Sequence, residues 1–331
     1  MTKRCLRAAI IGCGLIGQKR ARSIAAPLIV VVCCDLDLNK AEALTKTLAG
    51  AEASRDWHAT VTRDDIDVVF VCTTHDLLAV ITEAAVLAGK HVLVEKPGAR
   101  RASELNPVVA AMKKSGSVVR VGFNHRYHRA FQKARELCDS GVLAELLFIR
   151  ARYGHGGRLG YEREWRAIPH ISGGGEAIDQ GTHLLDLARW FLGDLRFVGG
   201  KAPTYFWDVP VEDNAFFLLE TKQRQVAFLH ASWTEWKNLF SFEICGRMGK
   251  LEISGLGGSY GTERLAHYQM SAEMGPPATT IYEYPMKDDS WEREMADFVI
   301  DINTQRPARP GVEDAQSVLL LIEELYLSQR P

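Results

Sequence analysis

The chain has 331 residues, of which 47% are hydrophobic and 24% are charged. This length favours two domains of about 100–200 residues each, and the composition excludes a disordered chain, a collagen and a coiled coil. Forty Lys and Arg residues nearly balance 41 Asp and Glu residues, for a formal charge of −1. No overall basic field exists to hold nucleic acid or an anionic membrane, so we expect neither as a partner.

The start of the chain shows basic residues before an apolar run, which is superficially typical of a signal peptide. The run covers only 8–11 before Gly12, whereas a signal peptide needs about 7–15 apolar residues and a membrane span about 18. The seven cysteines are odd in number and form no C-x-x-C motif. We therefore expect a cytoplasmic protein with reduced thiols and no metal site.

The first third of the chain alternates short apolar runs with helix-like stretches. The runs predict strands at 6–11, 28–34, 68–72, 91–94 and 118–121. The stretches between them predict helices at 17–26, 39–48, 77–88 and 103–114, the last with Ser103 as its N-cap. Because strands that are apolar on both faces belong to a covered parallel sheet, residues 1–123 are predicted to form an α/β domain.

After Phe123 the pattern changes. In this part of the chain, helices are predicted at 127–140, 176–192 and 312–328, and strands are predicted at 145–152, 214–221, 225–233, 240–245 and 250–254. The glycine-rich stretch 154–175 shows no periodicity and is interpreted as a loop or lid. A hairpin signal at 246–249 favours an antiparallel meander. Residues 124–331 are thus predicted to form an α+β domain with a mainly antiparallel open sheet.

A glycine motif, Gly12-Cys13-Gly14-Leu15-Ile16-Gly17, follows the first predicted strand and opens the first predicted helix. Such glycines let the chain turn sharply and let a pyrophosphate approach backbone N–H groups at a helix N-terminus. Asp35 ends the second strand, where a carboxylate binds the ribose 2′-hydroxyl. This pattern indicates a Rossmann domain that prefers NAD, and NADP stays possible because Lys40 is near in sequence.

Three other segments carry candidate site residues. Glu95-Lys96-Pro97 ends the fourth strand, at the sheet edge where ligands of such folds bind. Asp179 and His183 follow Gly173-Gly174-Gly175, with a spacing that would place both on one face of a helix. The alternatives without a functional role are a solvated ion pair at the end of the strand, for Glu95 and Lys96, and a core histidine whose hydrogen bonding is satisfied by its carboxylate neighbour, for His183. Thr73-Thr74-His75 ends the third strand and either lines the cofactor or begins a surface helix.

In this order the motifs resemble those of the Gfo/Idh/MocA oxidoreductases, the glucose-fructose oxidoreductase and inositol dehydrogenase family. The resemblance covers essentially the whole chain and departs from the common pattern at Thr74-His75, where Pro-Asn is frequent. It implies an NAD(P)-binding Rossmann domain and a second domain whose open sheet mediates homodimers or homotetramers. It also implies Lys96, Asp179 and His183 as the catalytic set, with His183 as the acid/base.

The expected cofactor-binding residues are Gly12, Gly14, Leu15, Ile16, Gly17, Asp35, Thr73, Thr74, His75, Glu95 and Lys96. The expected substrate-binding residues are Asn124, Arg126, Tyr153, His155, Arg158, Trp165, Arg166, Asp179 and His183. Polar aromatic residues and arginines of this kind suit a sugar, nucleotide sugar or cyclitol, with a slight preference for an anionic one. Two alternatives stay open: an NAD-dependent glycoside hydrolase that works by transient oxidation, and a cofactor-sensing protein without turnover.

Overall fold

The computed structural model describes residues 5–273 and 275–330, which group into two compact units. The first unit comprises the chain up to Phe123 together with Trp291–Ser317. The second comprises Asn124–Ser290 together with the chain from Val318 onward. The division differs from the one predicted above at 291–317, because this segment contributes apolar side chains to the core of the first unit.

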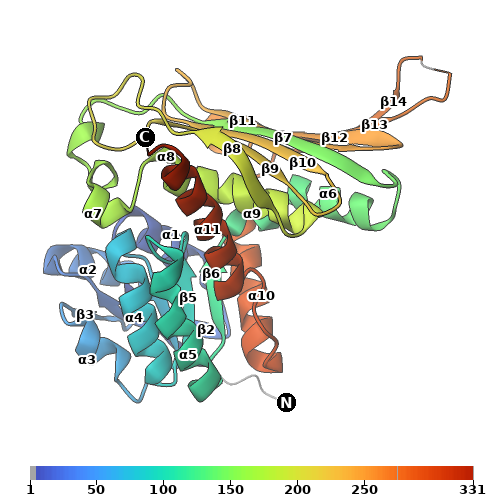
Figure 1. Ribbon diagram of the computed structural model, residues 1–331. Coiled ribbons are helices and arrows are strands. Elements are labelled where there is room, and N and C mark those ends of the chain that lie inside the picture. Colours follow the sequence, from blue (N-terminus) through green and yellow to red (C-terminus); the bar gives the residue numbers. More distant parts are fainter. Residues whose placement is uncertain (1–4, 274, 331) are drawn as a thin grey trace. The chain divides into compact units, whose positions relative to one another are not determined.

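The first unit is built on a six-stranded parallel sheet (Figure 1). Its strands, in spatial order, are β3 (Glu52–Ser54), β2 (Leu28–Cys34), β1 (Leu6–Ile11), β4 (Val68–Val71), β5 (His91–Glu95) and β6 (Val119–Gly122). The central strands are buried almost throughout, as the continuous apolar runs predicted. The crossover between β1 and β4 makes this the doubly wound order in which a ligand binds at the carboxyl ends of the strands.

Helices cover both faces of this sheet. On one face α1 (Leu15–Ser23), α2 (Leu38–Thr45) and α10 (Ser290–Thr304) contribute to a common apolar core. On the other, α4 (His75–Leu87) packs beside α5 (Asn106–Ser115) (Figure 1). The predicted N-cap at Ser103 is wrong: that residue lies in a 3-10 turn, η1 (Ala102–Leu105), and α5 begins after Leu105 with a proline in its first turn, a position that proline tolerates.

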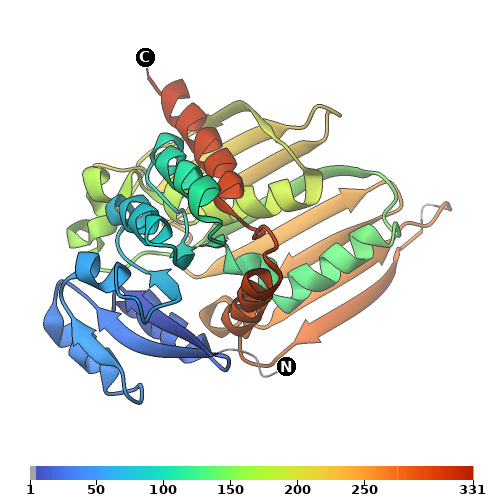
Figure 2. The same ribbon diagram turned by 90° about the horizontal axis from the view of Figure 1, so that it is seen from below.

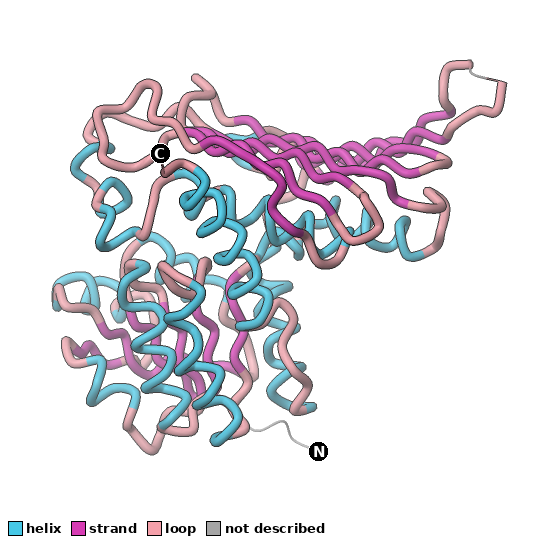
Figure 3. Tube along the Cα trace, viewed as in Figure 1, coloured by secondary structure: helices cyan, strands magenta, loops and turns pink. Residues whose placement is uncertain are grey.

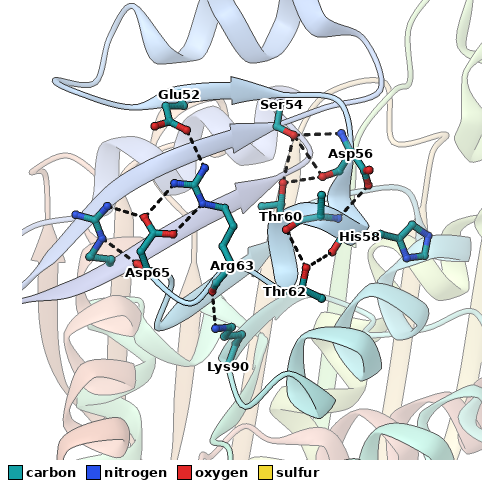
Figure 4. Close-up of polar contacts among 11 residues, drawn as sticks. Glu52, Ser54, Asp56, His58, Thr60, Thr62, Arg63, Asp65 and Lys90 are labelled. Atoms are coloured by element: carbon teal, nitrogen blue, oxygen red, sulfur yellow. Dashed lines mark hydrogen bonds and ion pairs between the residues drawn. The ribbon is translucent and has the colours of Figure 1, made fainter.

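The sequence predicted no element between residues 48 and 68, where the structure has β3 and the short helix α3 (Trp57–Val61). Polar contacts hold this segment (Figure 4). The Asp56 carboxylate accepts a hydrogen bond from the Ala59 amide at 3.0 Å and so caps α3. Arg63 forms ion pairs with Glu52 at 2.7 Å and Asp65 at 2.8 Å. Because these stabilising contacts are polar, the segment has no apolar periodicity to detect.

The second unit is built on an eight-stranded sheet. Its strands, in spatial order, are β14 (Ala278–Tyr284), β13 (Glu263–Gln269), β12 (Gly249–Ser254), β11 (Leu239–Gly246), β7 (Leu146–Gly154), β10 (Val226–Ser232), β9 (Asn214–Glu220) and β8 (Arg196–Lys201). The predicted meander is wrong at its centre, because β7 inserts between β11 and β10 and pairs in parallel with β10. The other pairs are antiparallel, which confirms the mainly antiparallel sheet.

The helices of the second unit lie on one side of this sheet. Figures 2 and 3 show α6 (Arg129–Asp139) and α9 (Gly181–Leu192) lying against the strands on that side. Side chains alternate accordingly: Ile149 and Ala151 of β7 are buried, whereas Arg150 and Arg152 are exposed. On the opposite face, called the open face below, no helix lies among the described residues of this unit.

The helix predicted at 176–192 is two helices, α8 (Glu176–Asp179) and α9, that break at Gln180. The final predicted helix is confirmed as α11 (Val312–Ser328). The remaining short elements are α7 (Pro169–Ser172) and the 3-10 turns η2 (Asn124–Tyr127), η3 (Tyr161–Arg163), η4 (Trp165–Ala167) and η5 (Gly258–Tyr260). Over the described ranges, no helix is both long enough and apolar enough to cross a membrane.

Candidate functional site

The glycine loop of the first unit has the geometry that a dinucleotide requires. Gly12 has φ +95°, and a Cβ there would lie 2.4 Å from the Cys72 carbonyl oxygen. A Cβ on Gly17 would lie 2.0 Å from the Gly12 carbonyl oxygen, whereas one on Gly14 would meet nothing within 4 Å. Gly14 also precedes α1 without any side-chain cap. The three glycines therefore serve a tight turn, close helix packing and open access to backbone N–H groups, and the residues present fit NAD.

The Asp35 carboxylate is built into this loop. One oxygen accepts a hydrogen bond from the Cys13 amide at 2.8 Å and the other accepts one from the Asp37 amide at 2.9 Å. The Lys40 ammonium forms an ion pair with the Asp37 carboxylate, at 3.9 Å. This arrangement keeps a negative charge at the end of β2, which favours a ribose hydroxyl over a 2′-phosphate.

The segment after β4 approaches the same loop. The backbone of Cys72 and Thr73 is what a Cβ on Gly12 would strike, which places Thr73 against the glycine motif. Thr74 precedes α4, and its hydroxyl donates to Asp76 at 2.6 Å. His75 begins α4 and is only 4% exposed. It is therefore a buried histidine, not a surface residue at the start of a helix.

Glu95 and Lys96 are adjacent in the chain but differ in how deeply they are buried. Glu95 is buried and accepts a hydrogen bond from Arg20 of α1 at 2.6 Å, and Arg20 also pairs with Glu294 of α10 at 2.5 Å. Burial raises the pKa of Glu294. The Glu95 carboxylate is thus engaged inside the unit, which argues against a direct contact with the cofactor. Lys96 follows β5 and is half-buried.

In the second unit, Asp179 and His183 lie in two successive helices rather than in the single predicted one, with the break at Gln180. Asp179 ends α8, and its carboxylate accepts a hydrogen bond from Arg166 at 3.0 Å. His183 lies in the first turn of α9, where its amide donates to the Gln180 carbonyl oxygen at 3.0 Å. Both residues are buried, Asp179 with 8% and His183 with 5% of the residue exposed.

Aromatic side chains surround His183. Its ring stacks on His125 with centroids 3.7 Å apart and an interplanar angle of 21°. The Tyr153 centroid lies 6.2 Å from the His183 ring and 5.4 Å from the Tyr260 ring. Burial raises the pKa of Tyr153 well above its ordinary value and that of Tyr260 to about 12. Both phenols are therefore neutral hydrogen-bonding groups at physiological pH.

The arginines of the loop 154–175 are already paired with carboxylates. Arg158 lies 2.6 Å from Glu164, Arg163 lies 3.3 Å from Glu162, and Arg166 pairs with Asp179 and, at 3.7 Å, with Glu164. Trp165 packs against the Arg166 guanidinium at 4.6 Å. Burial lowers the pKa of His155 and so favours its neutral form. The cationic surplus suggested by the sequence is thus balanced within the loop.

Two other predicted substrate residues have structural partners. The Arg126 guanidinium forms two hydrogen bonds to Asp186, at 2.6 and 2.8 Å, and is buried. The Asn124 amide donates to the Ser290 hydroxyl at 2.9 Å. Arg126 therefore anchors η2 to α9, and the same contacts argue against its use as a ligand for substrate.

The triple glycine is explained by packing. A Cβ on Gly174 would lie 1.9 Å from the Tyr326 hydroxyl, and one on Gly175 would lie 1.9 Å from the Glu212 carbonyl oxygen. Glu212 is buried, accepts from Tyr326 at 2.7 Å and from the Ala177 amide at 3.0 Å, and has a pKa raised by burial. Sequence reasoning missed Glu212, Tyr326 and His125, because their partners are distant in the chain.

Within the residues that the structure describes, no group of three or more His, Cys, Asp or Glu side chains could hold a metal ion. The seven cysteines are free thiols, and five of them are buried.

Comparison with protein families identifies both halves of the chain. Residues 6–123 match the model of an oxidoreductase family with an NAD-binding Rossmann fold, GFO_IDH_MocA. Residues 131–252 match the model of the GFO/IDH/MocA C-terminal domain. Together the two matches cover well over half of the chain.

Curated relatives are dehydrogenases of sugars and cyclitols by name. Levoglucosan dehydrogenase of Pseudarthrobacter phenanthrenivorans is 29% identical over 65% of this chain and 58% of its own length. D-glucoside 3-dehydrogenase of Escherichia coli is 34% identical over 58% of this chain and 56% of its own. An inositol 2-dehydrogenase of Salmonella typhimurium is 28% identical over 57% and 55%. The chain therefore spans little more than half the length of the curated relatives it matches.

Solved structures share the fold over nearly the whole chain. A levoglucosan dehydrogenase in complex with NADH aligns with a TM-score of 0.88 at 22% identity, covering 98% of this chain and 96% of that one. An oxidoreductase domain protein from Kribbella flavida aligns with a TM-score of 0.84 at 25% identity, covering 99% and 98%. With both family models matched and the fold shared throughout, the chain belongs to the GFO/IDH/MocA family of oxidoreductases and carries its NAD-binding Rossmann domain.

Proposed function

We propose that this chain is an NAD-dependent dehydrogenase or reductase that acts on a secondary alcohol or ketone of a sugar or cyclitol. The observation that carries the proposal is the buried cluster around His183 and the Arg166–Asp179 pair, in a chain whose other unit holds a complete dinucleotide loop. A histidine kept out of water among polar groups suits proton transfer. The names of the curated relatives support the substrate class.

In the proposed reaction, bound NAD⁺ supplies the hydride acceptor for the carbinol carbon. His183 accepts the proton of the reacting hydroxyl, and in the reverse direction returns it to the carbonyl oxygen. Lys96 donates a hydrogen bond to that oxygen and stabilises its alkoxide character. Asp179, held by Arg166 at 3.0 Å, orients the donors around the oxygen. The first turn of α9 favours a neutral His183, because the positive end of the helix dipole opposes an imidazolium there.

Charge balance in the loop 154–175 favours a neutral substrate. Each of its three arginines has a carboxylate partner. An anionic sugar would have to displace such a partner, at the cost of leaving a carboxylate unpaired. Neutral sugars, glycosides and cyclitols need no such exchange, so we place them ahead of nucleotide sugars. Tyr153, His155 and Trp165 supply the stacking and neutral hydrogen-bonding groups that a polyol requires.

The open face of the eight-stranded sheet supports self-association. Phe228 and its cross-strand partner Leu218 are 48% and 39% exposed, and Val198 of β8 is 48% exposed. Exposed apolar side chains on neighbouring strands favour contact with another protein surface. We assign the face to a second copy of the chain, in a homodimer or homotetramer.

The experiment is a substrate panel. NAD-loaded protein is mixed with inositols, free sugars, glucosides, uronic acids and nucleotide sugars, while reduced-nicotinamide absorbance is followed and products are identified by mass spectrometry. A reduced-nicotinamide band with an oxidised product is the expected result. Glycoside cleavage without net reduction would establish the hydrolase alternative instead, and the absence of turnover alongside tight NAD binding would favour a sensor.

The role of His183 is tested separately. Replacing it with Ala or Asn should lower kcat by about 10²–10⁴-fold, the usual contribution of a positioned acid/base, while NAD affinity measured by calorimetry stays unchanged. The Asn variant guards against loss of packing in the cluster. Turnover equal to that of the native protein would refute the assigned base.

A further inference from the structure

The strongest feature that the proposed mechanism leaves unused is the imidazole of His125. It lies face to face with His183, with centroids 3.7 Å apart, and both rings are nearly inaccessible to solvent, at 6% and 5% exposure. The His125 ring also contacts Tyr153 and His128, each with centroids 5.3 Å away. Its plane is therefore set by packing on several sides.

Hydrogen bonds determine which nitrogen of His125 carries a proton. The Asn124 amide nitrogen donates to the Ser290 hydroxyl at 2.9 Å, which leaves the Asn124 amide oxygen as an acceptor. His125 Nδ1 lies 3.2 Å from that oxygen and therefore donates to it. A second proton, on Nε2, would make His125 an imidazolium and would strengthen this hydrogen bond through its charge.

His128 and Tyr153 contact the His125 ring, and Tyr153 also lies beside the His183 ring. Other titratable or charged groups are connected to the pair through these residues or through neighbours in the chain: Arg126, Arg166, Glu176, Asp179, Asp186, Tyr260, Glu263 and Asp288. Four of the carboxylates have a basic partner: Asp179 pairs with Arg166, Asp186 pairs with Arg126, and Glu263 and Asp288 both lie within ion-pair distance of His128. The local field is thus largely balanced around the stacked histidines.

We propose that His125 is a positioning residue, an inference that rests on the proposed role of His183. His125 takes up the first proton that the stacked pair binds as the pH falls, and it thereby holds the His183 ring neutral and correctly oriented. Two imidazolium ions stacked this closely in a buried site would repel each other, so the pair favours a single proton. The two sites differ in what surrounds them. His183 lies at the positive end of α9, whereas His125 donates to an amide oxygen, so the proton resides on His125.

Histidine NMR tests this assignment without requiring turnover. Protein labelled with ¹³C in its histidine rings is titrated as the native chain and as His125→Phe, which keeps an aromatic face but cannot be protonated. We expect the titration midpoint of His183 to rise by about one pH unit or more in His125→Phe. Signals are assigned by their loss in His125→Phe and His183→Asn. An unchanged or lowered His183 midpoint would overturn the proposal.

Kinetics provide the second readout. Once a substrate is known, the acid limb of the kcat/KM profile for alcohol oxidation should move to higher pH by a similar amount in His125→Phe. His125→Asn, which removes the ring, should lower kcat by about tenfold or more with NAD affinity unchanged. Native kcat in both variants would contradict the positioning role, and thermal unfolding confirms that each variant is folded.

His230 supplies a matched control. It is also a stacked histidine, with its centroid 4.1 Å from that of Phe216, but it lies on the open face of the sheet. His230→Phe should leave the His183 midpoint and the kcat/KM profile unchanged, and a shift as large as that of His125→Phe would overturn the proposal. The substrate panel decides the proposed function and native-level turnover by His183→Ala would refute the assigned base, whereas the titration midpoints judge His125 independently.

Discussion

Single glycines in this chain act in two different ways. Gly14 leaves open space beside the start of α1, whereas Gly174 and Gly175 have none, because Tyr326 and Glu212 occupy the positions that side chains would take. The first kind leaves room for a ligand, and the second kind lets backbones approach each other. The same residue type thus serves access in one unit and close packing in the other.

The packing role of Gly175 predicts a clear stability effect. Gly175→Ala would place a Cβ 1.9 Å from the Glu212 carbonyl oxygen, so the backbone must shift. We expect a loss of about 1–3 kcal/mol in the free energy of unfolding, the usual cost of overpacking, measured by urea denaturation. Gly199→Ala, whose Cβ would meet nothing within 4 Å, is the control. If the two variants were equally stable, the close approach of Gly175 to the Glu212 carbonyl oxygen would not be a determinant of stability.

Asp35 predicts a cofactor preference. Asp35→Ser removes the carboxylate at the end of β2 and should weaken NAD binding by about tenfold or more, since hydrogen bonds to charged groups contribute roughly 1.5–3 kcal/mol. NADP binding should fall much less, because a negative charge no longer opposes its 2′-phosphate. Affinities are measured by calorimetry, with Asp37→Ser as the control because serine can also cap α2. Equal losses for both cofactors would contradict the ribose role.

At the scale of elements, sequence order and spatial order diverge in both units. Helix α10 follows the sheet of the second unit in the chain but packs on the sheet of the first, where Met295 and Phe298 join the core. Strand β7 precedes β8–β10 in sequence but pairs between β10 and β11. In each case the apolar pattern identifies a buried face without identifying the partner that buries it.

Helix α10 predicts that the first unit depends on residues after Trp291. Phe298 is fully buried, with its ring 6.4 Å from that of Phe70 in β4. Phe298→Ala should lower the free energy of unfolding by about 3–5 kcal/mol, whereas Ile300→Ala, at a position 49% exposed on the same helix, should change it by less than about 1 kcal/mol. Urea denaturation, monitored through NAD binding, measures both changes in the free energy of unfolding. Similar losses would show that α10 is not part of this core.

At the scale of the molecule, charge and apolar surface are distributed differently. The near-neutral total charge arises from many local pairs, such as those of Arg120 with Asp297 and Asp301 in the first unit. Apolar side chains, by contrast, are left uncovered on one face of the eight-stranded sheet. Charge therefore contributes little to long-range recognition here, and exposed apolar area is the feature that favours association.

The open face predicts a measurable change in oligomeric state. Phe228→Asp places a charge beside Leu218 on this face and should raise the dissociation constant of the oligomer by about 30-fold or more, as expected for an interface hot spot. Sedimentation velocity over a range of protein concentrations measures the change. Leu87→Asp, on the exposed side of α4 in the first unit, is 59% exposed in the native chain and should leave association unchanged. An unaltered oligomer in Phe228→Asp would exclude this face as the contact.

The sequence alone determined those features whose cause is local. Continuous apolar runs specified the parallel strands, the glycine spacing and Asp35 specified the dinucleotide loop, and amphipathic periodicity specified α11 with its observed bounds. The alternating pattern after β8 likewise indicated an antiparallel sheet. Each follows from backbone geometry or periodicity within a few residues, so no knowledge of distant partners is needed.

Only the tertiary structure decided which residues meet across long separations. It split the predicted helix at Gln180 and so moved His183 to a helix N-terminus, and it stacked His125 on His183. It also engaged Arg126 with Asp186, a pair 60 residues apart that spacing alone does not indicate. These contacts depend on side-chain packing and on the pairing of buried charges, which are properties of the folded chain and leave no periodic signal in the sequence.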